Sequence, residues 1–106
     1  MNLNGTYRLL KSRNMDIEEV TGIGKYEEKN EKERTLYLKD DKVFLVVNKN
    51  TIEVRTDGEL SKLLKEKYES VMESRYFGRG GIEIVLANQL TKSELEDLVR
   101  LSYNLS

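Results

Sequence analysis

The segment from Arg75 to Gly81 contains the residue types in this chain that are best suited to binding an anion. It has two arginines, two aromatic residues and three glycines, and it has no acidic residue. Glycines let backbone amides approach an anion, and the planar guanidinium of arginine matches the oxygens of a phosphate or carboxylate. The aromatic rings could stack on a nucleic-acid base. The candidate contacts for nucleic acid or another anion in this segment are Arg75, Tyr76, Arg79 and Gly80.

The glycines of this segment do not follow the pattern of the common nucleotide-binding loops. No Gly-Lys-Ser/Thr follows them, and they precede a predicted strand, whereas the dinucleotide fingerprint precedes a helix. An alternative interpretation is a turn that requires positive φ angles, flanked by core aromatic residues and solvated arginines. Arg55, together with Lys62, Lys65 and Lys67, could extend the basic patch, although the neighbouring glutamates are typical of an ordinary solvated helix.

The composition excludes most catalytic mechanisms that depend on histidine or cysteine. The chain has neither residue, so disulfides, thiolate metal sites and the usual neutral-pH base are excluded. Adjacent acids such as Asp40-Asp41, which suit a tight turn between antiparallel strands, point to solvent rather than toward each other. The serines have no visible general base. We therefore predict no enzymatic activity, no metal and no cofactor.

Positive and negative charges are almost balanced over the sequence. The formal net charge is −1, from 18 basic and 19 acidic residues, so nucleic-acid binding would depend on a local patch. The segment Tyr26 to Arg34 alternates acids and bases and has no apolar residue after Tyr26. This pattern is typical of a solvated loop or a hairpin tip. The same segment is a candidate surface for a protein partner.

Length and hydrophobic patterning predict one α+β domain over residues 1–106. No apolar run approaches the roughly 20 residues of a membrane helix, and the N-terminus lacks a signal-peptide pattern, so we expect a cytoplasmic protein without membrane contact.

The pattern of apolar residues predicts three helices. The first is Asn2 to Ser12. The second has Leu60, Leu63, Leu64, Tyr68 and Val71 on its apolar side, and the third has Leu95, Leu98, Val99, Leu101, Ser102 and Leu105 on its apolar side. The expected strands are Val20 to Tyr26, Thr35 to Lys39, Lys42 to Asn48, Thr51 to Thr56 and Ile82 to Leu86.

The expected order of elements is α-β-β-β-β-α-β-α. This order predicts a two-layer fold with an antiparallel sheet of about five strands and the helices on one face. Asp57 or Thr56 is expected to cap the second helix, and Thr91 with Glu94 has the spacing of a capping box at the last helix. Ser102, within an apolar helix face, is expected to bond back to a carbonyl of its own helix.

The second half of the sequence has a distinctive succession of motifs. A strand ending in a basic residue and an acid precedes a helix, a turn leads into a strand, and a last helix carries Ser-Tyr near its end. These motifs are Val54-Arg55-Thr56-Asp57, Leu60 to Tyr68, Ser74-Arg75-Tyr76 with Gly80-Gly81-Ile82, and Leu95 to Leu105 with Ser102-Tyr103. Residues 51–106 in this respect resemble the MmcQ/YjbR family of small bacterial proteins. The sequence departs from that family at Ile82, where the family usually has Trp, and in having no proline.

The resemblance implies a fold similar to that of frataxin-like and secretion-chaperone-like proteins, and members of the family are often described as DNA-binding. Our first hypothesis is therefore a non-enzymatic binding module that contacts nucleic acid through Arg55, Arg75 and Arg79 by phosphate contacts. Our second hypothesis is a protein-interaction module that uses an exposed sheet face or the charged segment Tyr26 to Arg34. In either case we expect a monomer or a homodimer.

The distribution of charge around the arginines distinguishes the two hypotheses. Nucleic acid is favoured if Arg55, Arg75 and Arg79 gather on one face without the nearby acids. A protein partner is favoured if acids interleave with them. The relevant acids are Glu53, Glu73 and Glu83.

Overall fold

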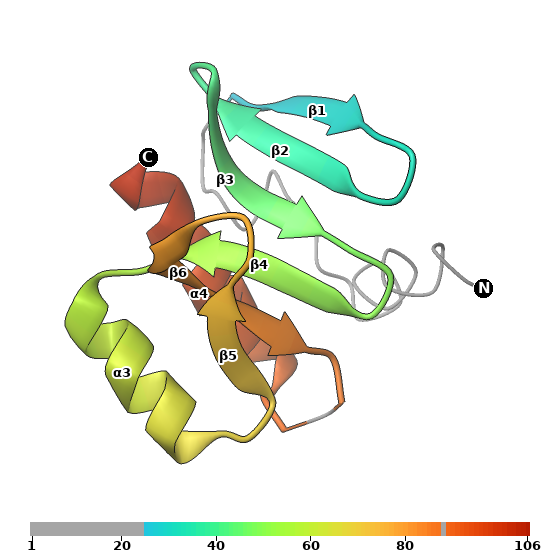
Figure 1. Cartoon of the computed structure of the whole chain (residues 1–106). Coiled ribbons are helices and arrows are strands. Elements are labelled where there is room, and N and C mark those ends of the chain that lie inside the picture. The colour runs from blue at the N-terminus through green and yellow to red at the C-terminus, as the bar shows by residue number, and fades with distance from the viewer. Residues whose placement is uncertain (1–24, 88) are drawn as a thin grey trace.

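The computed structural model describes residues 25–87 and 89–106, which form one antiparallel sheet and two helices (Figure 1). The elements are β1 (Glu27–Asn30), β2 (Thr35–Lys39), β3 (Lys42–Val47), β4 (Thr51–Arg55), α3 (Gly58–Lys67), β5 (Val71–Ser74), β6 (Gly78–Val85) and α4 (Lys92–Leu105). The strands lie in the order β1-β2-β3-β4-β6-β5. The predicted α+β class is therefore confirmed, with six strands in place of about five.

Local sequence signals explain most of the element boundaries. Asp40 and Asp41 have φ angles of 50° and 68°, as a tight hairpin turn with positive φ at both central residues requires. Asp57, not Thr56, caps α3 by accepting a hydrogen bond from the backbone N–H of Leu60 at 2.8 Å. The predicted capping box at Thr91 is confirmed, with both of its reciprocal hydrogen bonds present.

The second helix is shorter than its apolar periodicity predicts. α3 ends at Lys67, Tyr68 is extended, and Val71 lies in β5, where it pairs with Ile84. The expected apolar face is also narrower, because Leu63 is 63% exposed. The spacing of apolar residues that is typical of a helix can continue by chance into a neighbouring strand. Here residues Val71–Ser74 form a strand because they pair with β6.

The charged segment Tyr26 to Arg34 contains the first strand and the tip of a β-hairpin whose second strand is β2. Residues 27–30 form β1, which pairs with β2, so the expectation of a loop was wrong for this part. Residues 31–34 form the hairpin tip, closed by a bond from Glu31 N to Arg34 O of 2.8 Å. The predicted helix Asn2 to Ser12 and most of the predicted strand Val20 to Tyr26 lie outside the described residues. Lys25 and Tyr26 are described and precede β1.

The main core lies on one face of the sheet, between the strands and α4 (Figure 1). α4 packs on β3 and β4, whereas α3 packs on β5 and β6. Both helices contribute to one apolar cluster, Leu95 and Val99 from α4 and Leu60 and Leu64 from α3. Within the described residues, no helix combines the length and the apolar character needed to cross a membrane.

Ser102 fastens α4 to two central strands. Its Oγ donates to the carbonyl of Phe44 at 2.5 Å and accepts from the backbone N–H of Arg55 at 2.7 Å. The expected bond to a carbonyl of its own helix was therefore wrong. A buried hydroxyl can satisfy partners on another element just as well as on its own helix.

Candidate binding site

Two buried glutamates lie side by side on the sheet face opposite the main core. Glu53 of β4 and Glu83 of β6 are direct cross-strand partners, and each is only 2% exposed. Their neighbours along the strands, such as Ile52 and Ile84, point into the main core. Because side chains alternate along a strand, the two carboxylates point to the other face.

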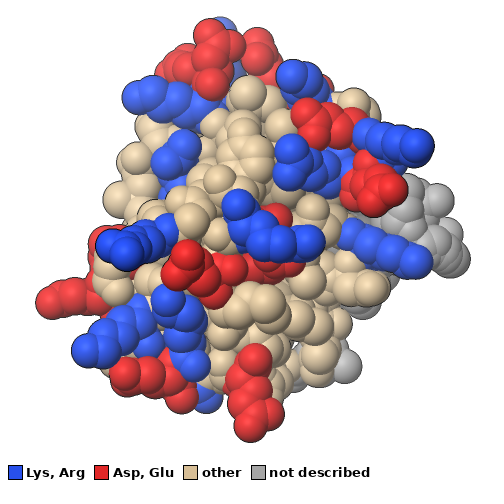
Figure 2. All heavy atoms as spheres, viewed as in Figure 1, with Lys and Arg blue, Asp and Glu red and all other residues tan. Residues whose placement is uncertain are grey.

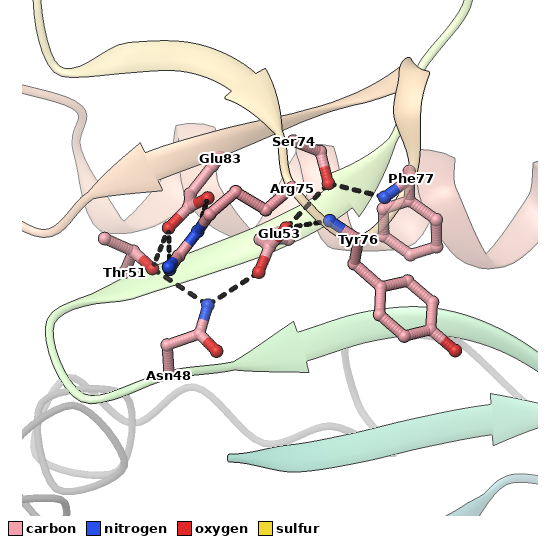
Figure 3. A network of polar contacts seen from close by, with 8 residues as sticks. All are labelled: Asn48, Thr51, Glu53, Ser74, Arg75, Tyr76, Phe77 and Glu83. Carbon is pink, nitrogen blue, oxygen red and sulfur yellow. Dashed lines mark hydrogen bonds and ion pairs between the residues drawn. The ribbon is translucent and has the colours of Figure 1, made fainter. Parts of the chain in front are cut away.

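Arg75 covers Glu83 and forms a two-point ion pair with it (Figure 3). Nε of Arg75 donates to Oε1 at 3.0 Å, Nη2 donates to Oε2 at 2.7 Å, and Thr51 Oγ1 also donates to Oε2 at 2.7 Å. Burial by itself raises the pKa of Glu83, but the hydrogen bonds from Arg75 and Thr51 and the arginine charge outweigh it, so that this pKa lies below its ordinary value. The hydrogen bond to Glu83 correspondingly raises the pKa of Arg75.

Glu53 is held by three neutral donors, two from the end of β5 and the β5–β6 turn and one from the β3–β4 turn. Its Oε1 accepts from Ser74 Oγ at 2.7 Å and from the backbone N–H of Tyr76 at 2.8 Å, and its Oε2 accepts from Asn48 Nδ2 at 2.7 Å. Figure 3 shows these bonds continuous with those of Glu83, because Asn48 also donates to Thr51 at 2.9 Å. The network therefore holds the β5–β6 turn against β4 and the β3–β4 turn.

Tyr76 and Phe77 continue this turn as a stack of aromatic and cationic groups. The guanidinium of Arg34 lies 5.2 Å from the Tyr76 ring centroid, Tyr76 meets Phe77 edge to face at 5.0 Å, and the guanidinium of Arg55 lies 4.8 Å from the Phe77 centroid. Nε of Arg55 also donates to the carbonyl of Val43 at 2.9 Å. These cation–π contacts help to fix both arginines, although Arg34 is also paired with Glu31 at 2.7 Å, whereas Arg55 has no carboxylate partner among the described residues.

Two of the three glycines at the start of β6, which follow the β5–β6 turn of residues 75–77, are required by the local structure. Gly78 has a φ of +62°, so the interpretation as a turn requiring positive φ is confirmed at this position. A Cβ on Gly81 would lie 2.8 Å from the Cβ of Phe77 and would also meet the carbonyl oxygen of Val54. The N–H of Gly80 donates to the Phe77 carbonyl at 3.2 Å, which occupies the amide that an anion would need.

The structure separates the five predicted contact residues into three groups. Arg75 and Tyr76 line an open hollow, whereas Arg55 and Gly80 are engaged within the fold and do not line it. Arg79, near the start of β6, is exposed and has no ion pair in the described part of the protein. The sequence analysis named Glu53 and Glu83 as acids near the arginines but did not predict that both are buried and hold the turn, because acids that alternate with apolar residues in a strand ordinarily face solvent.

The hollow that Arg75 and Tyr76 line has a volume of about 910 Å³ and is formed by four segments. Residues 31–34 of the β1–β2 turn, Asn48 and Lys49 of the β3–β4 turn, and Glu53 complete its lining. We refer to this site as the polar hollow. Figure 2 shows this side of the molecule, where basic and acidic side chains interleave and neither sign forms a large continuous patch.

Carboxylate clusters suited to a metal ion do not occur in residues 25–87 and 89–106. Within those two ranges, the buried acids Glu53 and Glu83 are instead satisfied by arginine, hydroxyl and amide donors. The arrangement is therefore suited to binding through hydrogen bonds and ion pairs.

Comparison with known proteins shows the fold but no family. No protein-family model and no curated protein matches the sequence. The fold is similar to that in the crystal structure of the Deinococcus radiodurans protein DR2400, a DUF419 domain, with a TM-score of 0.72 and 15% sequence identity over 85% of this chain and 75% of that chain. DUF419 is related to the MmcQ/YjbR family. At this level of identity the similarity extends to the fold alone, and it agrees with the fold that the sequence resemblance implies.

Proposed function

We propose that this protein is a non-enzymatic binding module of the MmcQ/YjbR type, and that its polar hollow binds a segment of another protein. The observation that supports this proposal is that Arg75, the arginine of the β5–β6 turn, is paired with a buried acid and lies beside a second one. Glu83 is bonded directly to Arg75, and the buried Glu53 lies beside it on the same face. This is the arrangement that favours a protein partner over nucleic acid.

A nucleic-acid backbone requires several cations that are free to meet successive phosphates. Arg75 is already paired with Glu83, and Arg55 is held by Phe77 and the Val43 carbonyl. A polyanion in the polar hollow would also meet the exposed carboxylates of residues 31 and 33. These contacts oppose DNA binding, and DNA binding is the alternative that the experiment below tests.

A polypeptide segment fits the chemistry of the polar hollow better. The lining offers both charge signs, and it includes Tyr76, which is 39% exposed. Tyrosine is enriched at the energetic centres of protein interfaces because it combines apolar area with a hydroxyl. In Figure 3 the Tyr76 ring points away from the glutamate network, so it can contact a ligand without breaking that network.

The test combines a selection from a displayed random-peptide library with amide-shift NMR of the full-length protein. We expect selected peptides to shift the amides of residues 31–34, 48–49 and 75–76. A short DNA duplex is expected to cause no shifts there at moderate salt. The Tyr76→Ser variant should lose peptide binding at least about fivefold. The control is Leu63→Ser, which removes an exposed apolar side chain from α3, away from the polar hollow.

Four results would contradict this proposal. The first is a library that yields no binder, and the second is a set of peptide-induced shifts that lie away from the polar hollow. The third is an equal loss of peptide binding in the Tyr76→Ser and Leu63→Ser variants. The fourth is a set of salt-sensitive shifts with the duplex at Arg55 and residues 75–81, which would favour the nucleic-acid hypothesis instead.

A further inference from the structure

The polar hollow contains charged groups that the fold leaves without partners. Arg34 is paired with Glu31 at 2.7 Å, and Glu53 accepts three hydrogen bonds. By contrast Lys32, Glu33 and Lys49 line the same hollow and have no ion pair among the described residues. The unpaired charges are thus two ammonium groups against one carboxylate.

Arg75 adds further hydrogen-bond donors to the polar hollow, on the side of its guanidinium that does not face Glu83. The Arg75 side chain is 74% exposed, although the side chain of its partner Glu83 is only 3% exposed. A guanidinium has five N–H donors, and Glu83 occupies Nε and one N–H of Nη2. The edge formed by Nη1 and the second N–H of Nη2 remains for a ligand.

Anchoring by Glu83 makes this free edge an effective binding group. A mobile arginine loses rotamer freedom when it binds an anion, whereas Arg75 is already held by two hydrogen bonds. The edge matches the two oxygens of a carboxylate in the bidentate geometry that arginine favours. Lys49, from the opposite turn of the polar hollow, supplies a second positive charge.

We propose that the free edge of Arg75, together with Lys49, binds a single carboxylate of the partner polypeptide. This inference rests on the proposed function and specifies its ligand chemistry. The carboxylate belongs to an aspartate or glutamate residue or to the C-terminus of the polypeptide, because both offer the same two oxygens. The hydroxyl of Tyr76, which has no hydrogen-bond partner in the described residues, provides a further donor at the same hollow.

Three short peptides distinguish a side-chain carboxylate from a C-terminal carboxylate in an NMR titration of the 106-residue protein. The first, acetyl-Gly-Gly-Glu-Gly-Gly-amide, carries only the carboxylate of its glutamate. The second, acetyl-Gly-Gly-Gly-Gly-Gly with a free C-terminus, carries only a terminal one, and the third has Gln in place of Glu and carries none. We expect the resonances of the Arg75 Nε–H and the Lys49 amide to shift on addition of at least one carboxylate peptide, with a Kd on the order of a few mM. The Gln peptide should not shift these resonances. Inorganic phosphate is titrated in parallel.

Two variants that remove the same charge provide the control. Lys49→Ser removes a cation from the polar hollow and leaves the pair of Arg75 and Glu83 intact. Arg79→Ser removes an exposed, unpaired cation outside the polar hollow. Lys49→Ser should weaken carboxylate binding at least about threefold, whereas Arg79→Ser should leave it within about twofold.

Each contrary result is informative. The inference is overturned if the Gln peptide shifts the same resonances equally, if no carboxylate peptide shifts them, if the two variants weaken binding equally, or if phosphate alone binds at Arg75. The proposed function is tested separately, by the library. Library peptides that bind the polar hollow through neutral sequences would leave the proposed function standing and remove the carboxylate inference.

Discussion

Glu83 is a buried carboxylate whose cationic partner among the described residues is the largely exposed Arg75. Such a pair is asymmetric, because solvent screens the guanidinium while the carboxylate depends on its hydrogen bonds. Thr51 supplies one of these bonds and Arg75 supplies two. The pair therefore acts chiefly to hold the β5–β6 turn in place.

The lowered pKa of Glu83 predicts a specific dependence of stability on pH. Because the folded protein holds this pKa below its ordinary value, the unfolded protein binds a proton at a higher pH than the folded protein does. The stability contributed by Glu83 is complete above about pH 5 and is lost as the pH falls through the folded pKa, below about pH 4.5. In urea unfolding between about pH 6 and pH 3, the wild type should lose more stability than Glu83→Gln.

Glu66→Gln is the matched control for this measurement, because Glu66 is an exposed residue of α3. Its pH profile should follow that of the wild type. Parallel profiles for the wild type and Glu83→Gln would show that Arg75 and Thr51 do not favour the ionised form of Glu83.

The β5–β6 turn contributes Arg75 and Tyr76 to the lining of the polar hollow. Its first residues form the glutamate network, and Phe77 packs over the small cluster of Leu36, Val43 and Val46. The turn can lie this close to the sheet because Gly81, the cross-strand partner of Arg55, has no side chain. Packing of the turn on the sheet therefore depends on this glycine.

Gly81→Ala should destabilise the fold and displace the turn. The new Cβ would collide with Phe77 and with the Val54 carbonyl, and overpacking of this kind costs about 1–3 kcal/mol. Thermal unfolding measures the loss of stability, and the amide shifts of Tyr76 and Phe77 report the displacement of the turn.

Gly80→Ala is the neighbouring control. Its new Cβ would meet only the Phe77 carbonyl oxygen, at an ordinary distance of 3.5 Å, so this variant should lose much less stability. Equal losses would exclude the Phe77 contact as the cause.

The whole molecule has nearly balanced charge, and its two signs interleave on the face that carries the polar hollow (Figure 2). A molecule of this kind has no extended positive field to attract a polyanion. Recognition at the polar hollow would therefore depend on individual pairs of groups at short range, for which electrostatic complementarity gives specificity.

We expect the protein to elute from immobilised heparin below about 0.15 M salt, because acids interleave with its cations and leave no extended basic surface. A variant that combines Glu31→Gln with Glu33→Gln removes two acids from the rim of the polar hollow. It should elute at higher salt than the wild type. Retention of the wild type above about 0.3 M salt would indicate a basic surface that interleaved acids do not neutralise.

The sequence by itself determined the strands β2, β3 and β4, the hairpin turn at Asp40-Asp41 and the capping box of α4. These features depend on local patterns, namely alternation, a run of apolar residues and the side chains at helix ends. β1 was missed because it is a fully exposed strand without apolar alternation, and β5 because its Val71 continues the period of α3. The α+β class followed from the order of the recognised elements.

Only the tertiary structure decided the composition of the candidate site. Arg75 and Tyr76 were identified from their types, but the partners that position them, Glu53 and Glu83, have the pattern of solvent-facing strand residues. Cross-strand pairing places the two glutamates together, and the β5–β6 turn then covers them. Local periodicity indicates which residues share a face of a strand. It contains no information on which distant segment covers that face, and here the covering segment anchors Arg75 on Glu83 and places it in a hollow that carries both signs of charge.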